Sequence, residues 1–150
     1  MGDLGIRPAA TDDIPAIVGL LADDPLGARR ESPGDLTPYL AAFERLTSDP
    51  NQHLVVAVRE GRVIGTLQLT VIPGLSRRGA TRSIIEAVRI HADERGSGLG
   101  TRLIEWAIDE SRRQKCQLVQ LTSDKSRTDA HRFYERLGFA ASHAGFKLEL

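Results

Sequence analysis

The sequence has very little cysteine. Cys116 is the only one among 150 residues, which excludes an internal disulfide and a metal site built from several thiolates. We interpret Cys116 as a small apolar residue at the start of a strand, because catalysis by cysteine also needs a positioned histidine.

Net charge and long apolar runs are also missing. The 20 basic and 20 acidic residues cancel, so no overall field draws the protein to nucleic acid or to an anionic membrane. No apolar run approaches the roughly 18 residues of a membrane span. The first residues have neither the basic region nor the apolar stretch of a signal peptide. We therefore expect a cytoplasmic protein with neither a nucleic-acid nor a membrane partner.

What the chain does have is material for a core. Hydrophobic residues make up 41% and charged residues 27% of the 150 positions, which predicts a single globular domain over residues 1–150. The patterns of apolar residues and turn residues predict strands at 4–8, 54–59, 63–72, 83–92, 118–122 and 146–148, and helices after 11, after a loop at 24–38, over 98–114 and over 128–138. This order predicts an α/β fold: a mixed, mostly antiparallel sheet with a central parallel strand pair and helices on both faces.

A glycine-rich loop stands where a predicted strand passes into a helix. Its sequence is Arg95-Gly96-Ser97-Gly98-Leu99-Gly100. Glycines allow a sharp turn with exposed N–H groups, and the helix N-terminus and Arg95 add positive charge, so the loop suits a pyrophosphate. A tight connection without a ligand is the alternative. The spacing matches neither a Walker loop nor the dinucleotide-binding pattern, which disfavours a nucleotide triphosphatase and a dehydrogenase.

This loop and the segment His131-Arg132-Phe133-Tyr134-Glu135-Arg136-Leu137-Gly138-Phe139 resemble the GNAT superfamily of N-acetyltransferases over the whole chain. The family's R/Q-x-x-G-x-G/A loop matches at Arg95, Gly98 and Gly100, and its F-Y-x-x-x-G-F motif matches from Phe133. The resemblance implies a GNAT-like sheet, acetyl-coenzyme A (acetyl-CoA) as cosubstrate and an amine acceptor. It also implies that loop amides bind the pyrophosphate and that the preceding strand binds the pantetheine arm through its backbone. The implied cofactor-binding residues are Val88, Arg89, Ile90, Arg95, Gly96, Ser97, Gly98, Leu99, Gly100, Thr101, Arg127 and Tyr134. Arg127 is a departure, since many members have Asn there.

Glu86 interrupts the apolar face formed by the even positions of strand 83–92. One interpretation is a structural ion pair with Arg82, Arg89 or another arginine, because a buried unpaired carboxylate is costly. The other is a general base. An alkylammonium with a pKa near 10.4 must lose its proton before it attacks a thioester, and a carboxylate with a raised pKa is a suitable acceptor.

Tyr134 lies on the sheet-facing stripe of the last predicted helix, where an aromatic residue of the core is the simple interpretation. In related acetyltransferases a tyrosine at this position lies near the thioester sulfur. The resemblance therefore implies that Tyr134 protonates the departing thiolate or hydrogen-bonds the sulfur. No Ser or Cys nucleophile with an adjacent base is visible, so we expect direct attack of the amine, without a covalent intermediate and without a metal.

The acceptor is not identified by the sequence. By resemblance it lies between the loops 25–39 and 73–82, and Arg29, Arg30 and Tyr39 are the predicted contacts, with Glu31, Arg77 and Arg78 nearby. The arginines favour an acceptor that carries a carboxylate or phosphate beside its amine, although solvated loop charge explains them equally well. A regulatory module that binds acyl-CoA without turnover and a domain without a ligand are the alternative functions. A homodimer is left open.

Overall fold

The computed structural model describes residues 2–150 and comprises two compact units, one up to Gln120 and one from Leu121 to Leu150. The prediction of a single domain stays a prediction. In chain order the elements are β1 (Leu4–Pro8), η1 (Thr11–Asp13), α1 (Ile14–Ala22), α2 (Gly27–Arg30), α3 (Thr37–Thr47), β2 (Gln52–Arg59), β3 (Arg62–Ile72), α4 (Ser76–Gly79), β4 (Arg82–Ile90), η2 (Ala92–Glu94), α5 (Leu99–Arg113), β5 (Leu118–Leu121) and α6 (Thr128–Arg136).

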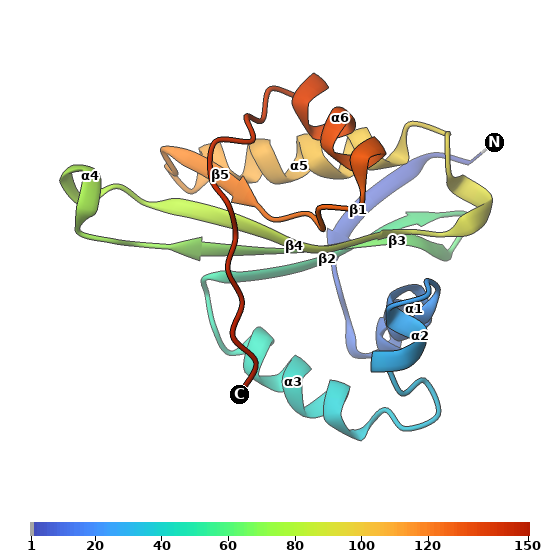
Figure 1. The fold of residues 1–150 in the computed structure, drawn as a ribbon. Coiled ribbons are helices and arrows are strands. Elements are labelled where there is room, and N and C mark those ends of the chain that lie inside the picture. The colour runs from blue at the N-terminus through green and yellow to red at the C-terminus, as the bar shows by residue number, and fades with distance from the viewer. Residues whose placement is uncertain (1) are drawn as a thin grey trace. The chain divides into compact units, whose positions relative to one another are not determined.

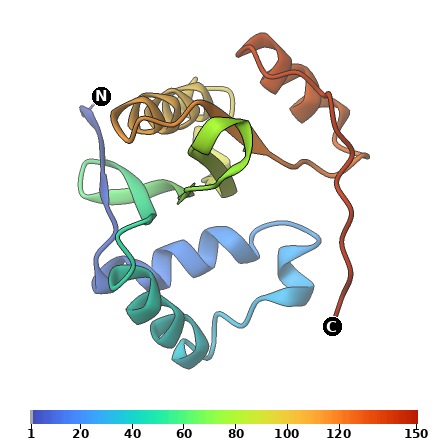
Figure 2. The ribbon, with the colours of Figure 1, turned by 90° about the vertical axis from the view of Figure 1, so that its left-hand side faces the viewer.

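The first unit is built on a sheet with the strand order β1-β2-β3-β4-β5. The strands β1 to β4 pair antiparallel, and β5 runs parallel to β4 after the crossover through α5. The helices α1, α2 and α3 cover one face and α5 covers the other (Figures 1 and 2). The predicted fold class is therefore confirmed. Among residues 2–150 no strand follows β5, so the parallel pair closes the strand order.

Two expectations about local structure are wrong. Residues 139–150 form neither helix nor strand, and Phe146 is 95% exposed. Their alternating apolar residues suit a strand, but a strand forms only where a neighbouring backbone offers hydrogen bonds. The loop expected at 24–38 contains the short helix α2.

Burial of one stripe explains α5 and the strands beneath it. Leu99, Leu103, Ile104 and Ala107 recur at spacings of three and four residues and are all buried, as expected for a helix facing a sheet. Each fully buried Leu or Ile contributes about 1.5 to 3 kcal/mol. The Ser83 and Ser111 hydroxyls hydrogen-bond at 2.7 Å and tie α5 to β4.

The opposite face has its own core and one buried ion pair. Side chains from α1, α3 and β2 form a cluster of Ile14, Ile17, Val18, Phe43 and Val56. Before it, the Arg7 guanidinium donates two hydrogen bonds to the Asp13 carboxylate, at 2.7 and 3.1 Å, and the Ala10 N–H donates a third at 2.7 Å. The bond from Arg7 is the main reason that the pKa of Asp13 lies below its ordinary value.

None of the helices within residues 2–150 is long and apolar enough to cross a membrane.

Candidate functional site

A β-bulge in β4 defines the site. Gln68 on β3 pairs with Glu86, whereas Thr66 pairs with Arg89, so Ala87 and Val88 together oppose Leu67. Ala87 carries the extra turn of the chain, with a φ of 52°, in the left-handed region that residues other than glycine rarely adopt. Bulges bend a strand and redirect side chains, and they recur beside active sites.

The Glu86 side chain is exposed, which corrects the expectation of a buried carboxylate. None of the described arginines forms an ion pair with it: Arg89 pairs with Asp24 at 3.4 Å, and Arg82 donates to Gln120 at 3.2 Å. The bulge is the reason for the error, because it breaks the alternation from which burial was inferred. The structural ion-pair interpretation is therefore wrong, and the role of Glu86 as a base stays a prediction.

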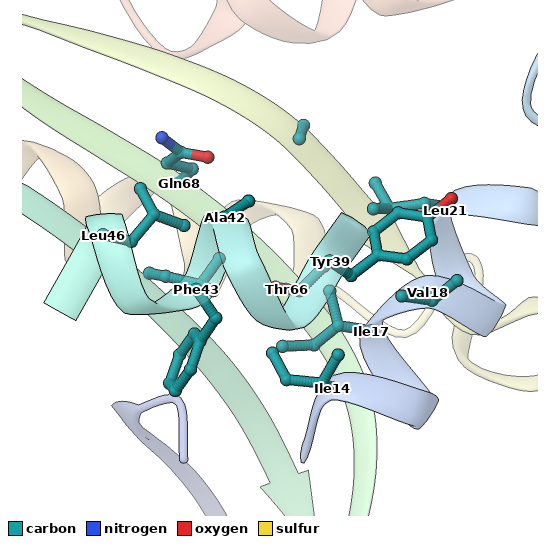
Figure 3. Close-up of a pocket in the computed structure, with 12 residues that line it drawn as sticks. Ile14, Ile17, Val18, Leu21, Tyr39, Ala42, Phe43, Leu46, Thr66 and Gln68 are labelled. Carbon is teal, nitrogen blue, oxygen red and sulfur yellow. The ribbon is translucent and has the colours of Figure 1, made fainter. Parts of the chain in front are cut away.

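A pocket of about 170 Å³ opens on the same face of the sheet, between α1, α3 and the bulge (Figure 3). Its polar residues are Tyr39, Thr66 and Gln68. The remaining lining is apolar and consists of Ile14, Ile17, Val18, Leu21, Ala42, Phe43, Leu46, Leu54 and Ala87.

Tyr39 is the one predicted acceptor contact that lines this pocket. Its hydroxyl accepts a hydrogen bond from the Ser32 N–H and donates one to the Glu31 carboxylate, both at 2.8 Å. The ring is thereby fixed at the end of the turn that follows α2. Arg29 and Arg30 belong to α2 and are exposed; neither lines the pocket.

The loop arginines do not form one cluster. Arg77 and Arg78 lie in α4 at the tip of the β3–β4 hairpin, near the pair of Ile72 with Arg82. Arg29 and Arg30 follow Asp24, which binds Arg89 near the other end of β4. Figure 1 shows α4 and α2 at opposite ends of the sheet.

Asp24 fixes the turn between α1 and α2. Its carboxylate accepts a hydrogen bond from the Gly27 N–H at 2.5 Å, and this bond is the main cause that lowers its pKa, with Arg89 and Arg30 adding to the effect. A Cβ at Gly27 would lie 1.9 Å from the Leu21 carbonyl oxygen, so the turn requires glycine. Asp24 therefore joins the acceptor-side turn to β4.

The glycine loop leaves open space before α5. Gly96 and Gly98 have φ values of 81° and 85°, and a Cβ built at either position meets nothing within 4 Å. The first hydrogen bond of the helix runs from the Arg102 N–H to the Gly98 carbonyl, so the N–H groups of the first turn have no acceptor within the helix. Arg95 is exposed and lies 3.9 Å from Asp23, a weak pairing.

The second half of β4 extends past β5. The Gln117 N–H donates to the Thr81 carbonyl at 2.8 Å, and β5 then has only four residues. At about 3.3 Å per residue, β5 runs beside the first half of β4. The backbone of Val88, Arg89 and Ile90 on that edge lies beyond the end of β5. The exposed N–H groups of α5 and this strand edge fit a ligand with a pyrophosphate and a long amide-containing arm.

Tyr134 and Arg127 belong to the second unit. The Tyr134 ring is half-buried and packs edge-to-face on Phe133 and Phe139, with ring centroids 5.2 and 5.9 Å apart. Arg127 precedes α6, and its carbonyl accepts a hydrogen bond from the His131 N–H at 3.1 Å. The F-Y-x-x-x-G-F motif thus supplies an aromatic cluster within its own unit.

Other reactive groups have structural partners. Burial raises the pKa of the Cys116 thiol, which disfavours the nucleophilic thiolate. His91 contacts Arg62 at 2.8 Å and the Asp93 N–H at 3.1 Å. Within residues 2–150 there is no group of three His, Cys, Asp or Glu that could hold a metal ion.

Sequence reasoning missed the residues that give the pocket its character. Thr66, Gln68 and Ala87 come from two strands, and Ala42 and Leu46 come from α3. The one usable signal was the polar alternation of Gln68 and Thr70 in an otherwise apolar strand, because polar residues on a covered sheet face need partners. Gln52 provides this partner, since its Oε1 accepts from Gln68 at 3.0 Å and from Thr70 at 2.8 Å.

The sequence matches the profile of the Acetyltransferase (GNAT) family over residues 15–139. Among characterised proteins it is 30% identical over 141 residues to an aminoalkylphosphonate N-acetyltransferase of Salmonella typhimurium, covering 94% of this chain and 88% of that protein. It is 36% identical over 90 residues to a glucosamine 6-phosphate N-acetyltransferase of Trypanosoma brucei brucei, covering 60% of this chain and 59% of the relative.

Among solved structures, a transcriptional regulator from Bacillus halodurans C-125 is similar over nearly the whole chain. The two share 43% sequence identity and superpose with a TM-score of 0.94, over 99% of this chain and 100% of the other.

Proposed function

Because this chain belongs to the GNAT acetyltransferase family and is an N-acetyltransferase, we propose that it transfers acetyl directly from acetyl-CoA to an amine bound beside the β4 bulge. The family uses acetyl-CoA as its cosubstrate, which supplies a thioester whose carbonyl carbon an amine can attack. The observation that carries the proposal is the open glycine loop, where Gly96 and Gly98 leave room beside the free N–H groups of α5.

The proposed donor site consists of the strand edge Val88, Arg89 and Ile90 and the loop from Arg95 to Thr101. The loop N–H groups bind phosphate oxygens, and Arg95 adds a full positive charge. The strand backbone binds amide groups of the pantetheine arm. Arg127 is an additional proposed contact from the second unit.

Glu86 is the proposed general base. Its carboxylate is exposed and has no described ion-pair partner, so it is available to accept a proton from the ammonium, directly or through a water molecule. Tyr134 is the proposed hydrogen-bond donor to the leaving sulfur. Its phenol pKa near 10 and a thiol pKa near 8.5 make protonation of the thiolate feasible but weakly driven.

For the acceptor, we propose an amine that contacts the Tyr39 ring, with Arg29 and Arg30 available to an anionic group outside the pocket. Two relatives are named for amines that carry a phosphonate or a phosphate, which agrees with a role for these arginines. The cytoplasm is the proposed location, and a homodimer remains part of the proposal without a structural argument.

Two measurements test the proposed function. Calorimetry measures binding of acetyl-CoA, and release of free thiol in the presence of a panel of amines measures transfer. Binding together with amine-dependent thiol release supports an acetyltransferase of this mechanism. Binding without release for any amine supports the regulatory acyl-CoA-binding module instead, and no binding contradicts both.

A further inference from the structure

The pocket between α1, α3 and the β4 bulge contains no charged side chain. Nine of its twelve lining residues are apolar, and the other three are Tyr39, Thr66 and Gln68. Figure 3 shows the aliphatic side chains of α1 and α3 turned toward one another across this space. Such a lining favours an apolar group and penalises a charge, because a buried unpaired charge loses its hydration without compensation.

The polar lining residues already have protein partners. The Tyr39 hydroxyl is bonded to Ser32 and Glu31. The Thr66 hydroxyl donates to the Val55 carbonyl at 2.9 Å. The Gln68 amide nitrogen donates to Gln52 at 3.0 Å. These groups therefore have little hydrogen-bonding capacity left for a polar ligand, and their remaining contribution to the pocket is shape.

The size of the pocket limits what fits. Its volume is about 170 Å³, close to the roughly 150 Å³ of an apolar cavity that accommodates benzene. A branched aliphatic group of four or five carbons or a phenyl ring is of this size. A sugar ring with its hydroxyl groups would leave several of them unsatisfied against aliphatic walls.

The pocket adjoins the proposed base. Gln68 lines the pocket and pairs directly with Glu86 across the two strands. Side chains of directly paired residues extend from the same face of a sheet, with Cβ atoms about 4.5 to 5.5 Å apart. Ala87, the next residue, is itself part of the lining. An amine at Glu86 therefore has its substituent at the mouth of the pocket.

We propose that the acceptor is a primary amine with a compact apolar substituent, which occupies the pocket lined by Ile17, Leu21, Tyr39, Ala42 and Leu46 while the amine lies at Glu86. This inference rests on the proposed function and adds the class of the acceptor. The apolar substituent is the part that the pocket selects. An anionic group, where the acceptor has one, lies outside the pocket.

The test compares acceptors that differ only in apolar size. Ethylamine and isoamylamine form one pair, and glycine and leucine form a second pair with equal charge; 1,4-diaminobutane places a second charge where isoamylamine has methyl groups. Each buried methylene contributes about 0.8 kcal/mol, or roughly four-fold in affinity. Three added carbons should raise kcat/KM for isoamylamine by roughly 10- to 60-fold over ethylamine, and 1,4-diaminobutane should gain nothing.

A pair of variants on α3 locates the effect. Ala42 lines the pocket and Ala41 does not, and both are exposed, so leucine at either position should leave the fold intact. Ala42→Leu fills the pocket and should bring the kcat/KM ratio of isoamylamine to ethylamine within about three-fold of one. Ala41→Leu should keep the ratio of the unmodified protein.

The outcomes separate this inference from the proposed function. Equal kcat/KM for ethylamine and isoamylamine, or a preference that survives Ala42→Leu, overturns the inference and leaves the acetyltransferase intact. If no amine releases thiol, the proposed function fails and calorimetry with isoamylamine in the presence of coenzyme A still decides. Binding that Ala42→Leu removes and Ala41→Leu keeps supports the pocket, and absence of binding overturns it.

Discussion

Gln68 on β3 and Glu86 on β4 lie directly opposite each other, one residue before the bulge at Ala87. The pair brings the lining of an apolar pocket and an exposed carboxylate to the same face of the sheet. The bulge maintains this arrangement, because it ends the regular pairing after Glu86 and turns Ala87 toward the same pocket.

Replacement of Glu86 tests the proposed base. Glu86→Gln should lower turnover at neutral pH by about 100- to 10,000-fold, and turnover should recover partly at higher pH as the amine loses its proton in solution. Because the side chain is exposed and has no described ion-pair partner, the free energy of unfolding should change by less than about 0.5 kcal/mol. Glu44→Gln, at an exposed position of α3, is the control. Normal turnover in Glu86→Gln would exclude a role as base.

A side chain at Gly98 should prevent binding of acetyl-CoA. Gly98→Glu places a side chain and a negative charge in the space beside the N–H groups of α5, and the left-handed backbone adds about 1 to 2 kcal/mol of strain. Calorimetry should show no binding, while circular dichroism shows a folded protein. Gly19→Glu is the matched control, since its Cβ also meets nothing within 4 Å. Unchanged affinity in Gly98→Glu would reject the phosphate-binding role of the loop.

Tyr134→Phe should separate binding from chemistry. Loss of a hydroxyl that donates to the leaving sulfur should lower kcat by roughly 10- to 1000-fold and keep the affinity for acetyl-CoA within a few-fold. The edge-to-face packing on Phe133 and Phe139 is retained by a phenyl ring, so stability should change little. A variant with full kcat would assign Tyr134 to packing alone.

Gly27→Ala should destabilise the turn between α1 and α2. The added Cβ meets the Leu21 carbonyl oxygen at 1.9 Å, so the backbone must shift, at a cost of about 1 to 3 kcal/mol. Urea unfolding measures this cost. Gly34→Ala, in the following turn and with no atom within 4 Å of its Cβ, should leave the midpoint nearly unchanged. Equal midpoints for the two variants would contradict the close approach at Gly27.

The Arg7–Asp13 pair predicts a dependence of stability on pH. The pKa of Asp13 is below its ordinary value of 3.8 in the folded protein, so the pair contributes its full stability above pH about 4 and loses it as the pH falls through the lower, folded pKa. Asp13→Asn should therefore lower the free energy of unfolding at pH 7 by about 1 to 3 kcal/mol and have a smaller effect at pH about 2. Asp12→Asn, at an exposed neighbour, is the control. An equal effect of Asp13→Asn at both pH values would contradict the ion pair.

Strong local patterns made part of the fold predictable. The apolar stripe of α5 and the glycines before it predicted a strand, a phosphate-type loop and a helix, and the structure has β4, a turn with left-handed glycines and α5. The hairpin of β2 and β3 was also predictable, because Glu60 and Gly61 form a short turn between two β-rich segments.

The bulge was not predictable from the same reasoning. The even positions of β4 alternate regularly, and Ala87 is not a residue that favours a left-handed backbone, so nothing local indicates the change of phase at Glu86. The short helix α2 depends on the Asp24 carboxylate meeting the Gly27 N–H, a contact that appears only once the turn is closed. The pocket requires α1, α3 and two strands together, and sequence spacing does not specify how their side chains meet.

The walls of the pocket differ in how much the rest of the protein depends on them. Thr66 is 1% exposed and hydrogen-bonds across the sheet, whereas Ala42 is exposed on the outer part of α3. Substitutions at Ala42 can therefore reshape the pocket without disturbing the sheet, but substitutions at Thr66 cannot. During evolution, drift in acceptor preference should begin on α3, and descendants of one ancestor could diverge in the amines they accept while their strands remain alike.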